Sequence, residues 1–240
     1  MGKLRVFYDG PSTGAVNMER DAALLAAHTG GADPILRLYR WEPAAVTIGY
    51  NQDPAAFDTG GFGAAGYDVV RRPTGGRAIL HADELTYAVI GSSPGPVFGT
   101  TLHDTYMKIN EALLAFLAGL GIAADISPGE SRDEARGPVC FQSAGRHEVC
   151  VDGKKIIGSA QRRTGGVFLQ HGSILAGPRH LELATLLKAG TDHDPGELAE
   201  VTTDLGRLLG APQGGTELDA LAPRLAEAFG RVLGLEPVPA

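Results

Sequence analysis

A glycine loop between short strands constrains this chain more than any other feature of its sequence. The stretch YDVVRRPTGGRAILHADELTYAVI, residues 67–90, begins with the strand-like Val69 and Val70. After the two glycines it continues with two more strand-like runs, Ala78–Leu80 and Leu85–Ile90. Adjacent glycines suit an ordinary turn, but they also let the backbone approach a ligand closely because no Cβ intervenes. The three arginines beside them favour an anion or a carbonyl as that ligand.

Strand patterns dominate the chain before residue 178, and helical patterns follow it. Further strands are expected at Leu4–Phe7, Ile35–Trp41, Val46–Tyr50, Val167–Gln170 and Gly172–Leu175. Apolar and polar residues alternate in Ile35–Trp41, so this strand should be half-buried. A turn is expected at 9–12 and a hairpin over 149–158. Helices are expected at Asn17–His28, Thr101–Gly119, Arg179–Lys188, Thr203–Leu209 and Leu218–Leu233. The polar segment 127–138 is predicted to be a mobile loop. This order indicates an α+β fold, with one domain over residues 1–240 and residues 178–240 as its helical C-terminal part.

Charge and motif content argue against several classes of function. The net charge of −7 opposes general nucleic-acid binding, so an acidic partner needs a local cluster such as Arg71, Arg72, Arg162 and Arg163. No run approaches the ~18 apolar residues of a membrane span, and no signal-peptide pattern opens the chain, so we expect a cytoplasmic protein without membrane contact. The absence of HxxxH, CxxC and P-loop patterns excludes those routes to zinc and ATP, while other nucleotide-binding folds stay open.

Cysteines and lysines are the candidates for covalent chemistry. Cys140, in the apolar run GPVCF, is either a small buried hydrophobe or a nucleophile whose thiolate a neighbouring group stabilises. Cys150 alternates with valines and is expected to be structural. Lys154 lies beside the hairpin turn and should face solvent. Lys155, if it points inward, becomes a cation beside the bound ligand.

Small residues and histidines complete the set of candidates. Gly158, Ser159 and Ala160 form a run that can pack closely against a flat or linear ligand. His81 and His171 are either hydrogen-bonded structural residues or participants in catalysis, and their sequence context suits both.

Together these segments resemble the lipoate/octanoate protein ligase and transferase family. The resemblance runs in family order through Asn17-Met18 with Asp21, residues 43–52, Arg71–Ala78 with His81, Lys155 with Gly158–Gln161, and Leu169–Ser173. It implies a mixed β-sheet catalytic domain flanked by helices, a fold shared with biotin protein ligases. It also implies an eight-carbon acyl group beside the glycine loop. The acceptor would be a lysine of a lipoyl-carrier protein, such as the glycine cleavage H protein or a dehydrogenase E2 subunit.

Within this family the chain is most similar to the cysteine-dependent octanoyltransferases of the LipM type. Pro138–Phe141 resembles the segment that holds their nucleophile, although residues 142–147 depart from the usual pattern. Gly75–Ala78 lacks the third glycine typical of ligases, and the chain ends near the point where a ligase's accessory domain would begin. The alternatives are an ATP- and Mg²⁺-dependent lipoate ligase and a non-catalytic lipoyl- or acyl-binding protein. Retention of both Cys140 and Lys155 argues against the latter.

The resemblance assigns roles to individual residues. Octanoyl would pass from octanoyl-acyl carrier protein to the carrier lysine through a Cys140 thioester, with Lys155 as the second catalytic residue and with no ATP, metal or other cofactor. The implied substrate-binding residues are Arg71, Arg72, Thr74, Gly75, Gly76, Arg77, His81, Gly158, Ser159, Ala160 and His171. We expect the protein to act as a monomer.

Overall fold

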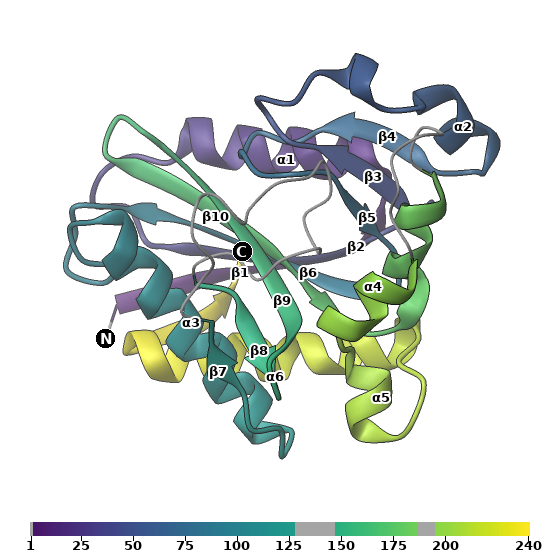
Figure 1. Cartoon of the computed structure of the whole chain (residues 1–240). Helices are drawn as coiled ribbons and strands as arrows, with labels where there is room; N and C mark the ends of the chain where they lie inside the picture. The colour runs from purple at the N-terminus through teal and green to yellow at the C-terminus, as the bar shows by residue number, and fades with distance from the viewer. Residues whose placement is uncertain (1, 128–146, 187–194) are drawn as a thin grey trace.

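A mixed β-sheet forms the centre of the molecule (Figure 1). The computed structural model describes residues 2–127, 147–186 and 195–240. Within them the large sheet has the strand order β11-β1-β2-β6-β10-β9-β8-β7, parallel between β11, β1 and β2 and antiparallel from β2 onward. Its strands are β1 (Gly2–Ser12), β2 (Ile35–Trp41), β6 (Glu84–Ser92), β7 (Asp125–Ile126), β8 (Val149–Val151), β9 (Lys154–Thr164), β10 (Val167–Leu175) and β11 (Leu235–Pro239).

A three-stranded sheet carries the glycine loop. Its order is β4-β3-β5, and the strands are β3 (Ala45–Ile48), β4 (Asp68–Arg71) and β5 (Ile79–His81). Because β4 runs parallel to β3 and β5 runs antiparallel to it, the chain must cross the end of β3 between residues 71 and 79. That crossing is the loop with the two glycines, so the loop is held at both ends by paired strands.

Helices cover both faces of the large sheet (Figure 1). The core residues of β6 alternate: Tyr87 and Val89 pack with the two long helices α3 and α6, and Ala88 and Ile90 pack with α1. The helices are α1 (Gly14–Ala27), η1 (Pro54–Ala56), α2 (Thr59–Ala64), α3 (Leu102–Gly119), η3 (Pro178–Leu186), α4 (Pro195–Val201), α5 (Leu205–Leu209) and α6 (Gly215–Leu233). The expected α+β fold, a mixed sheet flanked by helices, is confirmed. The helices in the described part of the chain are too short or too polar to span a lipid bilayer.

Local sequence explains where the best-predicted helix begins and ends. Thr101 caps α3 by accepting from the backbone N–H of Asp104, and Asp104 accepts from the backbone N–H of Thr101 in return. The buried face of α3 includes Ile109, Leu113 and Phe116 at helical spacing. Gly121, at φ +80°, then turns the chain away.

Several elements differ from the sequence prediction for identifiable reasons. Six of the seven residues of β2 are buried, not every second one, because the sheet is covered on both faces. The predicted turn at 9–12 belongs to β1, where a register shift between Tyr8 and Gly10 accommodates it. The two predicted runs of residues 167–175 form the single strand β10.

The C-terminal part is not wholly helical. It contains the unpredicted helix α4 and ends in the unpredicted strand β11, which pairs in parallel with β1. The connection at 58–66 contains the short helix α2. Most of the predicted mobile loop, from residue 128 onward, lies outside the described residues.

Candidate active site

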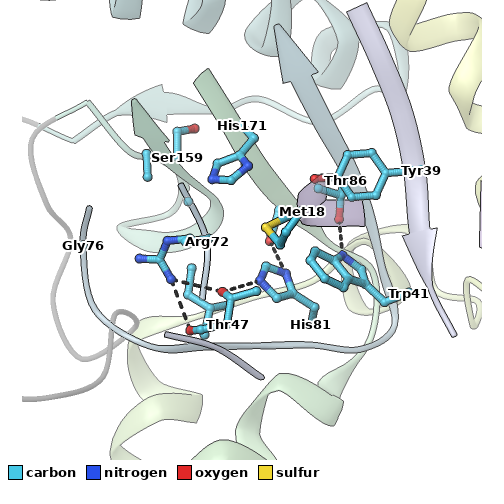
Figure 2. Close-up of a pocket in the computed structure, with 15 residues that line it drawn as sticks. Met18, Tyr39, Trp41, Thr47, Arg72, Gly76, His81, Thr86, Ser159 and His171 are labelled. Carbon is cyan, nitrogen blue, oxygen red and sulfur yellow. Dashed lines mark hydrogen bonds between the residues drawn. The ribbon is translucent and has the colours of Figure 1, made fainter. Parts of the chain in front are cut away.

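A small, largely apolar cavity of about 50 Å³ lies between the glycine loop and the strands β9 and β10 (Figure 2). It is bounded on one side by the aromatic rings of Tyr39 and Trp41 and on another by Gly76 of the loop. The full lining is Met18, Tyr39, Trp41, Thr47, Arg72, Gly76, Ile79, His81, Thr86, Gly158, Ser159, Ala160, His171, Gly172 and Ser173. Its lining, apolar with a few convergent polar groups, has the character of a small-ligand site.

His171 connects the glycine loop to a buried carboxylate. Its Nδ1 donates to Oδ2 of Asp21 at 2.9 Å, and its Nε2 lies 2.6 Å from Oγ1 of Thr74 in the loop. Burial lowers the pKa of His171 further than the hydrogen bond to Asp21 raises it. The ring is therefore neutral near pH 7, with its proton on Nδ1, and Thr74 donates to Nε2.

Asp21 is fully buried and is compensated by several donors. Burial alone would raise the pKa of Asp21, but the hydrogen bonds and charges of His171 and Arg37 outweigh it, so the pKa is lowered. Arg37 Nη1 donates to Asp21 Oδ1 at 2.7 Å, and the Tyr39 hydroxyl donates to Oδ2 at 2.9 Å. Arg37 also donates to Asp9 at 2.6 Å. This network fixes His171 and, through Thr74, the loop.

His81 belongs to a second buried network on the opposite wall of the cavity (Figure 2). Its Nδ1 lies 2.8 Å from Glu84 Oε1, and its Nε2 lies 2.8 Å from the hydroxyl of Thr47. The imidazole also stacks on the Trp41 ring, with centroids 4.1 Å apart. The Trp41 indole N–H donates to Thr86, which donates in turn to Glu84. His81 is thus held at both ring nitrogens and on one ring face.

Arg72 stabilises the glycine loop from within. Its guanidinium donates to the carbonyls of Thr47, Gly75 and Arg77, so the loop closes around it. Gly49, at the end of β3, lies so near the loop that a Cβ there would sit 1.9 Å from the carbonyl oxygen of Gly76. A residue with a side chain at Gly49 would therefore displace the loop.

The structure brings seven of the predicted substrate-binding residues to the cavity lining. They are Arg72, Gly76, His81, Gly158, Ser159, Ala160 and His171. Thr74 contacts His171 from behind, while Gly75 and Arg77 present their carbonyls to Arg72. Arg71 lies outside, exposed on the surface of the loop.

Lys155 points inward but is not part of the described cavity lining. It is 1% exposed and forms an ion pair with Glu148, which is also buried. Cys150, on the neighbouring strand β8, is buried as expected for a structural residue, and burial raises the pKa of its thiol. Cys140 lies outside the described residues. The described residues contain no group of three His, Cys, Asp or Glu that could hold a metal ion.

Several residues of the site were not identified as site residues from the sequence. They are Met18, Tyr39, Trp41, Thr47, Ile79, Thr86, Gly172 and Ser173 in the lining, and Arg37 and Glu84 behind it. An arginine in the middle of an apolar strand, as Arg37 is in β2, was the available signal, because a buried charge needs a buried partner. Asp21 matches the family pattern, but nothing local connects it to His171, 150 residues away.

Solved structures define the class of fold. The structure of lipoate-protein ligase A bound with ATP superimposes with a TM-score of 0.76 at 23% identity, covering 100% of this chain and 88% of that one. The bipartite lipoate protein ligase of Thermoplasma acidophilum gives a TM-score of 0.78, also at 23% identity, covering 100% and 87%. The fold is therefore that of the lipoate-protein ligases.

Sequence comparison then identifies the family. Residues 13–230 match the family model described as the lipoyl protein ligase A/B catalytic domain, and the chain belongs to this family. It is 39% identical to the octanoyltransferase LipM of Kyrpidia tusciae, covering 97% of this chain and 89% of that protein. It is also 39% identical to the octanoyltransferase LipM of Symbiobacterium thermophilum, covering 95% and 87%.

Proposed function

We propose that this protein is an octanoyltransferase of protein lipoylation. It would move an octanoyl group from octanoyl-acyl carrier protein to a specific lysine of a lipoyl-carrier protein, such as the glycine cleavage H protein or a dehydrogenase E2 subunit. The observation that carries this proposal is the identity of 39%, over nearly the whole chain, to proteins named octanoyltransferase LipM.

The described cavity supplies the apolar contacts that such a substrate needs. Met18, Ile79 and the rings of Tyr39 and Trp41 surround it. At ~0.8 kcal/mol for each buried methylene, the part of an octanoyl chain that enters this cavity would contribute to binding. Backbone N–H groups near Gly75 and Gly76 are the proposed donors to the oxyanion that forms on the thioester carbonyl.

Cys140 is the proposed nucleophile. Its thiolate attacks the thioester carbonyl of the donor, forming octanoyl-Cys140 and releasing the phosphopantetheine thiol. The ε-amine of the acceptor lysine then attacks the new thioester, forming the amide and returning the Cys140 thiol. The first step exchanges one thioester for another and the second forms a more stable amide, so the sequence needs no ATP.

Lys155 is proposed to assist as a buried cation. It forms an ion pair with Glu148 and lies on β9, the strand that supplies Gly158 to the cavity wall. A cation on this strand can orient the acyl carbonyl and help to stabilise the Cys140 thiolate.

An acceptor assay tests the proposed function. Wild-type protein is incubated with the glycine cleavage H protein and either octanoyl-acyl carrier protein or free octanoate, each with and without ATP and Mg²⁺. The proposal predicts octanoylation from the carrier protein without ATP. Modification only from octanoate with ATP would instead show a ligase. Tight octanoate binding with no modification of any acceptor would show an acyl-binding protein.

A further inference from the structure

Two arginines flank an exposed tyrosine on the outer surface of the glycine loop. Arg71 is exposed, and its Nη1 donates to the carbonyls of Gly49, Tyr50 and Gln52 at 3.1, 2.6 and 2.9 Å. The guanidinium of Arg162 lies 4.7 Å from the ring centroid of Tyr50, whose exposed fraction is 51%. We call Arg71, Tyr50 and Arg162 the arginine patch.

The arginine patch carries positive charge that no carboxylate neutralises among the described residues. Other arginines at the surface, such as Arg40 and Arg179, form ion pairs with aspartate or glutamate. Arg71 and Arg162 are held instead by backbone carbonyls. Arg71 Nη1 donates to the three carbonyls named above, and Arg162 Nη1 donates to the carbonyl of Pro73 at 3.1 Å. In a chain of net charge −7, two anchored guanidinium groups without acidic partners form a local site for an anion.

The arginine patch adjoins the cavity through the loop itself. Tyr50 N–H donates to the carbonyl of Thr74, and Gly49 packs against Gly76, which lines the cavity. Arg162 follows the cavity residue Ala160 by two positions on β9, a separation of roughly 7 Å along a strand. An anion bound at the patch would therefore lie just outside the acyl cavity, beside the glycine loop.

Arg163, the next residue on β9, does not extend the patch. Successive side chains of a strand point to opposite faces, and Arg163 contacts Ser93 and Thr105 of the other face. Arg72 is buried within the loop. The four arginines grouped by sequence therefore divide, and only Arg71 and Arg162 are placed to meet an external anion.

We propose that Arg71 and Arg162 bind the phosphate of the phosphopantetheine arm that delivers the acyl group. This inference rests on the proposed function, in which the donor thioester is carried on such an arm. The arm combines a thioester, an extended chain and a phosphate, so a donor with its acyl group in the cavity presents a phosphate outside it. Guanidinium groups are suited to this role because their planar N–H donors match phosphate oxygens.

The test compares two unreactive ligands that differ only in the phosphate. S-octyl-phosphopantetheine and S-octyl-pantetheine are thioethers and cannot transfer an acyl group, so calorimetric binding is measured without turnover. We expect wild-type protein to bind the phosphorylated ligand about tenfold more tightly. The ratio of the two dissociation constants should fall in Arg71→Gln and in Arg162→Gln, and approach one in the double variant.

The ratio within each protein cancels any general change in folding or in the cavity. Arg224→Gln is the matched control, because Arg224 also donates to a backbone carbonyl, that of Gly119, but lies on α6. That control should keep the wild-type ratio. A wild-type ratio of one, or a ratio unchanged in the double variant, would overturn the inference.

Two further outcomes distinguish the phosphate site from a contact with the carrier protein's surface and from the proposed transferase function. If the double variant weakens binding of the whole octanoyl-acyl carrier protein but leaves the ligand ratio unchanged, the patch contacts the carrier's acidic surface and the phosphate assignment is wrong. If the ratio behaves as expected but the acceptor assay shows no transfer, the phosphate site stands and the proposed function fails.

Discussion

His171 is held uncharged by its burial between Asp21 and Thr74. Its lowered pKa means that the unfolded chain takes up a proton, from about pH 6.5 downward, before the folded protein does. His171 therefore reduces stability as the pH falls through this window, by at most about 1.4 kcal/mol per pH unit. Asp21, whose pKa is also lowered, loses its contribution only at more acidic pH, below its usual range near 3.8.

The variant His171→Asn should flatten this dependence, because an asparagine amide can still donate to Asp21 but does not titrate. We expect the loss of unfolding free energy between ~pH 7 and ~pH 5 to be smaller in the variant than in the wild type, as measured by urea denaturation. His28 and His180, whose pKa values burial also lowers, contribute equally to both proteins. Equal pH dependence of the two proteins would show that His171 is not buried in its neutral form.

Lys155 and Glu148 form a buried pair, so removing one charge should cost more than removing both. Lys155→Met leaves the Glu148 carboxylate buried without this partner, and we expect a loss of roughly 3–5 kcal/mol in unfolding free energy. The double variant Lys155→Met with Glu148→Met should recover much of that loss while remaining inactive. Denaturant midpoints measure both effects. A single variant as stable as the wild type would contradict the burial of this pair.

Among the elements, β3 contacts the glycine loop closely at Gly49, next to Gly76 in the cavity lining. A Cβ at Gly49 would collide with the carbonyl of Gly76. We therefore expect Gly49→Ala to displace the loop, lower the unfolding free energy by about 1–3 kcal/mol and raise KM for the octanoyl donor.

Gly63→Ala is the control for that substitution. Gly63 lies in α2, and a Cβ there meets no atom within 4 Å. Alanine also has the higher helix propensity, so this variant should be as stable as the wild type or slightly more stable. If Gly49→Ala behaves like Gly63→Ala, the loop does not need the close approach seen here.

Elements whose periodicity is local were predictable from the sequence. The bounds of β2 were predicted as Ile35–Trp41 and are confirmed, and α3 begins one residue after its predicted start at Thr101. The alternation within β2 is misleading, because it predicts a half-buried strand and yet Arg37 in its middle is fully buried. Its partners Asp21 and Asp9 lie 16 and 28 residues away, and no local pattern reveals contacts of that range.

The site was predictable only where glycines and small residues mark a close approach. Gly76 and the run Gly158–Ala160 were expected beside the ligand and do line the cavity. Arg71 is exposed and Arg72 is buried because of the way the loop closes over β3, and only the folded chain determines that closure. β11 was missed because its pairing partner, β1, lies at the other end of the chain.

In the whole molecule, the fold places the apolar cavity beside the arginine patch. The large sheet, covered on both faces, supplies the rigid wall of β9 and β10, and the small sheet holds the glycine loop against it. The arginine patch lies on the outer side of that loop. A donor that carries an apolar acyl group and an acidic arm fits this arrangement, which is consistent with the proposed transfer from an acyl carrier protein.

We propose that Cys140 carries the octanoyl group during transfer. The direct measurement is intact-protein mass spectrometry after incubation with octanoyl-acyl carrier protein, without ATP and without acceptor. We predict one octanoyl adduct on the wild type, located on Cys140 by peptide mapping and removed by hydroxylamine, and no adduct on Cys140→Ala. Full octanoylation of the acceptor by Cys140→Ala, without ATP, would contradict the claim.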